Sequence, residues 1–380
     1  MAGPLGGVRV VELAAIGPAP YGVMLLADLG AEVVRVDRVA AAQGRPGAEA
    51  SMVGLSRNRR SVAVDLKSPA GLEVVRRLVG GADVLVEGFR PGVAERLGLG
   101  PEELCAAHPR LIYARVTGWG QEGPLAPRAG HDLDYAAVAG ALHGIGRPDT
   151  PPPPPINYLA DLGGGGTFLA IGVLAALMER ERSGRGQVVD VAMLDGAASQ
   201  TAFLHGLRQL GAWSLERGSN LLDGAAPYYD TYRCADGRFL AVAALEPAFH
   251  AELCERLGLD PAEWPQHDPA RWPEQKARLA ALLATRTREE WVEVFADSDA
   301  CVAPVLDLDE AADHPHNRAR GTFSDLHGVR QPAPAPRFSR TPGAIERPAP
   351  AFGADTDEVL ASLGYDEAAR TALRAEGAVA

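Results

Sequence analysis

The first 120 residues alternate between short apolar segments and helix-like segments, and this alternation limits the possible folds more than any other feature. Helix signals include a stop at Gly30 after residues 21–29, and a start at Ser68-Pro69. Such an alternation is typical of a parallel sheet with crossover helices, so we expect an α/β fold. Strands are predicted at 8–13, 32–36, 61–65, 84–86 and 111–116.

Three of the predicted strand ends carry a cation. Ligands of parallel sheets bind beyond the carboxyl ends of the strands, and there the sequence has Arg38, Lys67 and Arg90. The turn after the first strand, residues 15–19, lacks the GxGxxG pattern that brings backbone amides close to a pyrophosphate. We therefore expect an anionic ligand at this edge, but not a nicotinamide or flavin oxidoreductase.

Residues 57–60, Arg-Asn-Arg-Arg, allow two interpretations. They could form a solvated loop with surface arginines, which is the simpler interpretation of a charged run. They could also form a phosphate clamp, because guanidinium groups match the geometry of phosphate oxygens. Arg90 and Arg96 would add to such a clamp if they faced the same cleft.

The second half of the chain predicts a different domain. Residues 227–233 and 238–243, joined by Ala-Asp-Gly, are typical of a β-hairpin. Helical segments follow, then a proline-rich stretch at 331–350 that should be extended, and two terminal helices. We predict a large Rossmann-like domain at 1–215 and a small α+β domain at 216–330. Residues 331–380 would be an extended linker and helices that return to the large domain.

Composition narrows the function. The chain of 380 residues has a net charge of −12, which argues against general binding to nucleic acids or acidic membranes. No long apolar stretch predicts a membrane span, and no signal peptide is evident at the first residues. The four cysteines have no metal-ligand spacing, so no metal site and a cytoplasmic location are expected; they are Cys105, Cys234, Cys254 and Cys301.

The segment 130–166 contains the strongest candidates for chemistry. His131 stands near one end, and Asp161 precedes four glycines, residues 163–166, at the other. Taken alone, His131 could begin one helix or lie at the surface, and Asp161 could be the N-cap of the helix that follows it. The glycines could serve tight packing. Spacing alone does not show whether the two titratable groups converge.

Several motifs, taken together and in order, show a resemblance to a known family. The chain is similar to class III CoA transferases and α-methylacyl-CoA racemases, and most similar to the racemases. The resemblance runs nearly end to end. Its motifs include VVEL at 10–13, RNRRS at 57–61, EGFRPG at 87–92, GWGQEGP at 118–124, GHD at 130–132, DLGGG at 161–165 and NLLDG at 220–224.

The resemblance implies a fold, a partner and a ligand. The fold would be a Rossmann-like large domain with a small domain, and two chains would interlock as a homodimer. The ligand would be an acyl-CoA thioester. Its contacts would come from a set of residues near the strand ends and around His131: Arg38, Val64, Asp65, Leu66, Lys67, Gly88, Phe89, Arg90, Arg96, Gly130, Asp132 and Tyr135.

The resemblance also implies a mechanism. A thioester carbonyl acidifies its α-hydrogen, so two acid/base groups on opposite faces of that carbon suffice for racemisation through an enolate. His131 and Asp161 would be these groups, with Glu246 supporting His131. No metal and no cofactor are expected, since coenzyme A belongs to the substrate. Helix N-terminal amides after Asp161 could stabilise the enolate oxygen.

Two alternatives stay open. In a CoA transferase of this family, Asp161 would attack the thioester and form a mixed anhydride. His131 argues against this, because the transferases generally lack histidine there. The second alternative is a protein that binds CoA esters without catalysis. It would need the arginines but not His131 and Asp161 together.

Overall fold

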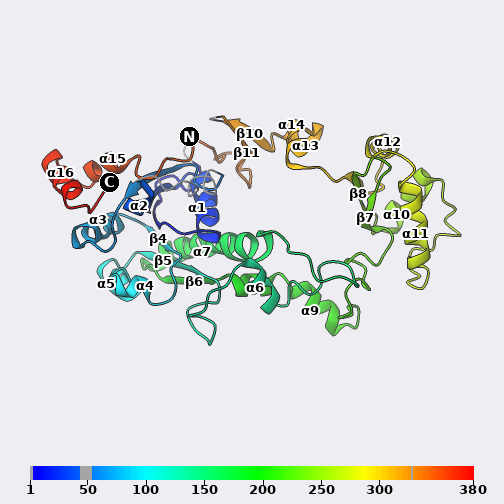
Figure 1. Cartoon of the computed structure of the whole chain (residues 1–380), viewed down its shortest axis with the longest axis horizontal. Coiled ribbons are helices and arrows are strands. Elements are labelled where there is room, and N and C mark those ends of the chain that lie inside the picture. Colours follow the sequence, from blue (N-terminus) through cyan, green and yellow to red (C-terminus); the bar gives the residue numbers. More distant parts are fainter. Residues whose placement is uncertain (1–2, 43–53, 327) are drawn as a thin grey trace. The chain divides into compact units, whose positions relative to one another are not determined.

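The computed structural model of the chain describes residues 3–42, 54–326 and 328–380 (Figure 1). The chain divides into two compact units. The large unit comprises Met1–Ala139, Pro155–Thr201 and Arg320–Ala380, and the small unit comprises Gly140–Pro154 and Ala202–Ala319. Residues 140–154 and 202–215, which the sequence placed in the large domain, thus belong to the small unit.

The large unit contains a six-stranded parallel sheet, which confirms the α/β prediction. Its strand order is β3-β2-β1-β4-β5-β6. The order reverses between β1 and β4, which makes that point the expected ligand site of the sheet. The strands are β1 (Arg9–Leu13), β2 (Glu32–Asp37), β3 (Arg59–Ala63), β4 (Val84–Glu87), β5 (Ile112–Thr117) and β6 (Val188–Ala192).

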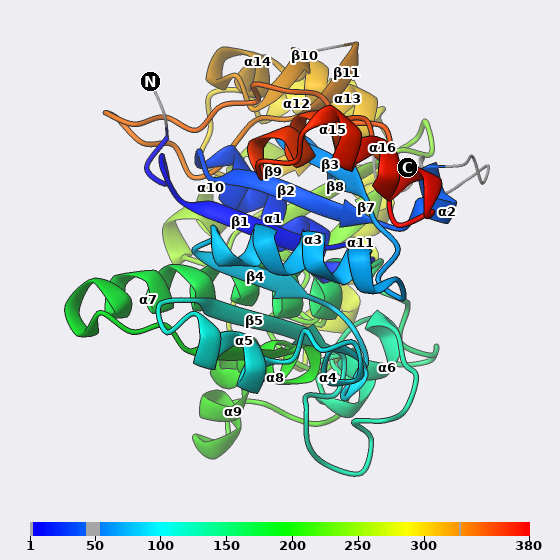
Figure 2. The ribbon, with the colours of Figure 1, turned by 90° about the vertical axis from the view of Figure 1, so that its left-hand side faces the viewer.

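Alternating side chains of the strands enter two separate apolar cores. Helices lie on both faces of the sheet (Figure 2). Val10 packs with α1 (Pro18–Asp28) and α7 (Thr167–Ser183) on one side of the sheet. Val11 packs on the other side, and the tail returns to this core. The helices there are α3 (Pro69–Gly80), α5 (Pro101–Ala107), α15 (Thr356–Ser362) and α16 (Glu367–Ala375).

The remaining elements of the large unit are short. They are α2 (Val39–Ala42), α4 (Val93–Arg96), α6 (Asp132–Val138), a π-helical segment η1 (Tyr158–Gly166), α8 (Met193–Ser199), and the antiparallel strands β10 (Phe323–Leu326) and β11 (Val329–Pro332). Segment η1 continues into α7, and the combined helix Tyr158–Ser183 is long and apolar enough to cross a membrane by length and composition. Half of its apolar window is buried, however, and a core helix passes the same test.

The small unit is built on an antiparallel sheet in the order β7-β8-β9. The predicted hairpin is confirmed, because β7 pairs with β8 around Gly237. Segment 140–154 is fastened to this unit by Arg217, which donates to the carbonyls of His143, Arg147 and Thr150. The elements are α9 (Ala202–Gln209), β7 (Tyr229–Arg233), β8 (Phe239–Ala243), α10 (Pro247–Leu257), α11 (Trp272–Leu283), α12 (Arg288–Val294), β9 (Val302–Pro304), α13 (Leu308–Asp313) and α14 (Pro315–Arg320).

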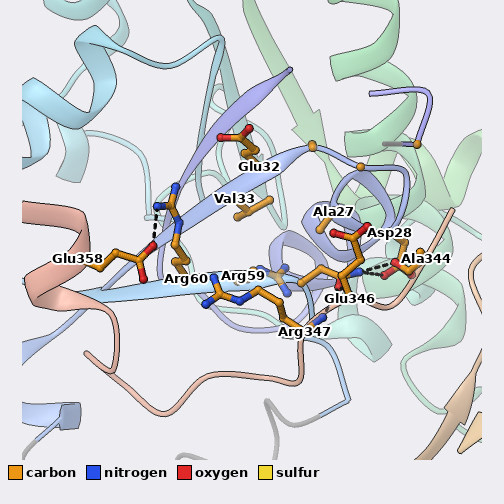
Figure 3. A pocket seen from close by; sticks show the side chains of 14 residues that line it. Ala27, Asp28, Glu32, Val33, Arg59, Arg60, Ala344, Glu346, Arg347 and Glu358 are labelled. Atoms are coloured by element: carbon orange, nitrogen blue, oxygen red, sulfur yellow. Dashed lines mark hydrogen bonds and ion pairs between the residues drawn. The ribbon is translucent and has the colours of Figure 1, made fainter. Parts of the chain in front are cut away.

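The arginines at 57–60 are neither a phosphate clamp nor, with one exception, surface residues. Arg59 forms an ion pair of 2.7 Å with Glu12, and both side chains are 0% exposed. Arg57 binds Asp28 in the same buried manner. Arg60 alone is partly exposed, and it pairs with Glu358 (Figure 3). Both interpretations of this motif therefore failed, because the sequence does not show which carboxylates are buried beside it.

Asn58 completes this structural role. Its side chain donates to the carbonyl of Ala344 and accepts from the amides of Glu346 and Arg347, so it binds the proline-rich tail segment to the large unit. These residues line a surface cavity of about 300 Å³ at the amino ends of β2 and β3 (Figure 3). Ligands of parallel sheets bind at the opposite, carboxyl ends, so we do not assign the chemistry to this cavity.

The Arg59–Glu12 pair leads to a stability prediction. Replacing Arg59 with leucine would leave the Glu12 carboxylate buried without its partner, which should lower the free energy of unfolding by about 3–5 kcal/mol. Urea denaturation would measure this loss. The variant Arg60→Leu, at a partly exposed ion pair, is the matched control and should change stability by about 0–1 kcal/mol. An equal loss of unfolding free energy in the two variants would contradict the structural role of the buried Arg59–Glu12 pair.

Candidate active site

A cavity of about 560 Å³ lies where β1, β4 and β5 end, at the reversal of strand order. The loops after these strands form one wall of it, with residues 16–19, 88–91 and 116–119. The segment before α6 and the helix segment η1 supply His131 and Asp161. The structure thus brings the two predicted acid/base residues, 30 positions apart in the chain, to one cavity.

His131 is the residue immediately before α6, in an extended backbone conformation. Its backbone amide donates a hydrogen bond of 2.9 Å to the Asp134 carboxylate, which fixes the start of the helix. The His131 residue is exposed at the cavity. An imidazole in this place is accessible to a ligand.

Asp161 lies in η1 and is only 8% exposed. Its Oδ2 accepts a hydrogen bond of 2.7 Å from the side-chain amide of Asn157. Gly17, at φ +73°, lies beside the same oxygen, because a Cβ added there would come within 3.2 Å of it. The carboxylate is therefore held from one side and borders the cavity.

Asp132 connects the two segments that carry the acid/base residues. It was expected to contact the CoA ester, but it is buried, and its Oδ1 accepts from the backbone amides of Ala160 and Asp161 at 2.8 and 2.7 Å. Because Asp132 follows His131 directly, this contact joins the start of α6 to the segment that carries Asp161. Asp132 thus supports the acid/base pair, and its predicted contact with the CoA ester stays a prediction.

The surroundings of Asp161 raise the pKa of its carboxyl above the value in water. Burial raises the pKa of Asp161, and the negative charge of Asp132 adds to this increase. The hydrogen bond from Asn157 and the charge of His131 lower the pKa and so oppose the shift. A carboxyl group with a raised pKa is better suited to take and return a proton near neutral pH.

The glycines after Asp161 serve close packing. A Cβ at Gly165 would come within 2.6 Å of Pro18 in α1, and one at Gly164 within 2.8 Å of the Ala197 amide nitrogen in α8. Within η1 their amides are part of the helix, and the amides of Ala160 and Asp161 already donate to Asp132. The packing interpretation is therefore the one that the structure supports, and the expected amide site for an enolate oxygen is not supported.

Five of the predicted ligand contacts line the cavity together with the acid/base pair: Gly88, Phe89, Arg90, Gly130 and Tyr135. The loop of Phe89 is held by Glu87, whose carboxylate accepts the Phe89 amide at 2.7 Å. Glu87 in turn pairs with Arg115 at 2.8 Å. The ring of Tyr135 packs edge-on against Trp119, with centroids 4.7 Å apart.

The other predicted contacts do not line this cavity. Val64 is buried and bridges to Val379, Asp65 and Leu66 are half-buried, and Arg38, Lys67 and Arg96 are exposed. Within the described part of the chain, the side chains of these three cations and of Arg90 form no ion pair, unlike Arg57 and Arg59. These four unpaired cations are thus available for an anion.

Glu246 precedes α10 in the small unit as its N-cap, and its support of His131 stays a prediction.

Sequence reasoning missed several residues of the cavity wall. Asn157, four positions before Asp161 and directly before η1, is the most important, because its side chain donates to the Asp161 carboxylate. Arg128, three positions before His131, adds a cation to the wall. The other wall residues that were not predicted as ligand contacts are mainly apolar and include Ile16, Trp119 and Met193.

The fold and this cavity define an α/β protein with a candidate ligand site at the topological switch point of its sheet. Residues 5–356 match the model of CoA-transferase family III, and the chain belongs to that family. It is 47% identical to an α-methylacyl-CoA racemase of Mus musculus over 96% of this chain and 94% of the relative. It is 46% identical to the α-methylacyl-CoA racemase of Homo sapiens over 95% and 94%.

A solved structure agrees with the fold. The crystal structure of a CaiB/BaiF family protein from Brucella suis covers 96% of this chain, and the chain covers 100% of that protein. The TM-score is 0.82 at 28% sequence identity. The combination of a parallel-sheet large unit and a small antiparallel unit is thus shared along nearly the whole length of the two chains.

Proposed function

We propose that this protein is an α-methylacyl-CoA racemase, an isomerase that interconverts the 2R and 2S forms of 2-methylacyl-CoA thioesters. The observation that carries this proposal is the convergence of His131 and Asp161 on one cavity, in a chain 46–47% identical to racemases over nearly its full length. Family membership alone would leave CoA transfer equally open.

The proposed reaction is a proton exchange at one carbon. One of the two groups removes the α-proton, and the electron pair of the C–H bond moves into the thioester to form an enolate. The other group then delivers its proton to the opposite face of the same carbon. The unpaired cations Arg38, Lys67, Arg90 and Arg96 would bind the phosphates of coenzyme A.

Three further features are part of the proposal. Glu246 would support His131 as the sequence predicts, and the enzyme would act in the cytoplasm as a homodimer. No cofactor would be needed, since the proton transfer uses side chains of this chain and coenzyme A belongs to the substrate. The cytoplasmic location rests on the scattered cysteines, and the other features rest on the resemblance of the chain to its family.

CoA transfer is the second candidate function, because the buried carboxylate of Asp161 could also act as a nucleophile. An assay with a single enantiomer of a 2-methylacyl-CoA separates the two. A racemase should convert the enantiomer without any added acid, and the addition of carboxylic acids should produce no new thioester. Transfer to an added acid, with the configuration at C2 retained, would replace the proposal by CoA transfer. Absence of both reactions across a panel of acyl chains would favour a non-catalytic CoA-ester binding protein.

A further inference from the structure

The two oxygens of the Asp161 carboxylate have different surroundings. Oδ2 accepts the hydrogen bond from Asn157 and has Gly17 beside it. Oδ1 receives no hydrogen bond from any residue that the structure describes. Since Asp161 lines the cavity and its Oδ2 is occupied, Oδ1 is the oxygen left for a ligand.

We propose that Asn157 is a positioning residue that holds Oδ2 of Asp161 and thereby commits Oδ1 to the transfer of the α-proton. This inference rests on the proposed racemase function. In one direction Oδ1 takes the proton from the α-carbon, and the C–H electron pair passes into the enolate. In the reverse direction the Oδ1–H group returns its proton to the enolate carbon and the carboxylate is restored.

Several charged and polar groups around Asp161 act on its pKa together with the hydrogen bond from Asn157. Helix α6 contributes the Asp132 carboxylate and the Tyr135 hydroxyl, and His131 lies at its start. Helices α1 and α8 present Pro18 and Met193 to the glycines of η1. Burial and Asp132 favour the neutral carboxyl, whereas Asn157 and His131 favour the carboxylate. Loss of the Asn157 donor should therefore raise the pKa of Asp161 further.

The test replaces Asn157 with leucine, which has a similar size but no donor. The control is Gln200→Leu, because the Gln200 amide also binds η1, at the Leu159 carbonyl, but does not contact Asp161. We expect kcat of Asn157→Leu to fall about tenfold to a hundredfold with a smaller change in KM, as for loss of a hydrogen bond to a charged group. The acid limb of its kcat/KM profile should move to higher pH. Gln200→Leu should leave that limb in place.

An infrared titration gives a readout that does not depend on activity. Infrared spectra are recorded for the wild type and for Asn157→Leu, each with and without the additional change Asp161→Asn. The difference spectrum of each pair isolates the protonated-carboxyl band of Asp161. The titration midpoint of this band should lie at higher pH in Asn157→Leu than in wild type. If Asn157→Leu folds poorly, Asn157→Ser serves instead, since its shorter side chain should not span to Oδ2. A midpoint equal to that of wild type would overturn the role of Asn157. If the midpoint shifts in Asn157→Leu but the wild-type protein exchanges no α-proton, the racemase function would be refuted. The role of Asn157 in positioning Asp161 would still stand.

Discussion

An Asp161→Asn variant should lose nearly all racemisation, with kcat/KM falling about 10²- to 10⁴-fold, as expected for the loss of a general acid/base. An amide of the same shape cannot take up the α-proton. The asparagine side chain keeps an oxygen that can accept from Asn157, and the backbone N–H of residue 161 can still donate to Asp132. Racemisation of single enantiomers, followed by chiral chromatography of the hydrolysed acid, measures the loss.

Unfolding should not explain that loss. Because burial raises the pKa of Asp161 in the folded state, its carboxyl stabilises the fold when protonated, and this contribution is lost as pH rises through that raised pKa. At neutral pH the neutral asparagine should thus not lower the unfolding temperature. Binding of an unreactive CoA thioester should also survive. An Asp161→Asn enzyme with wild-type turnover would show that Asp161 is not an acid/base group.

A His131→Ala variant should show a comparable loss of racemisation, because the second face of the α-carbon would have no proton donor or acceptor. The result would also separate the two family chemistries, since nucleophilic attack by Asp161 does not require a base on the opposite face. The assay is again the conversion of each pure enantiomer.

His205→Ala is the control for this variant, because His205 is exposed in α9 of the small unit and has no predicted role. It should retain full activity. If His131→Ala were as active as His205→Ala, the two-base mechanism would be wrong, even if Asp161 proved essential.

The sequence predicted the fold well where local patterns determine it. Five of the six strands of the large sheet were predicted in the first 120 residues, because buried parallel strands are short, apolar and regularly spaced. The hairpin of β7 and β8 was evident from its Ala-Asp-Gly turn. The resemblance carried His131 and Asp161, and the structure brings them together as the interpretation required.

Long-range pairing explains most of what the sequence did not show. Arg57 and Arg59 looked available for phosphate, but their partners Asp28 and Glu12 come from other strands and helices. The hydrogen bonds of Asp132 to the Ala160 and Asp161 amides within η1 were likewise not evident from the sequence. Asn157 carried a signal, its four-residue spacing from Asp161, that can be interpreted only once that segment is known to be helical.

The most direct test of the central claim is the incubation of the wild-type enzyme with one enantiomer of a 2-methylacyl-CoA in deuterated water, with no acceptor acid. We predict that deuterium enters the α-carbon while optical activity is lost, since a solvent-derived deuteron on one group replaces the proton that the other removed. Retention of the α-hydrogen and of the configuration, across a panel of acyl chains, would contradict it.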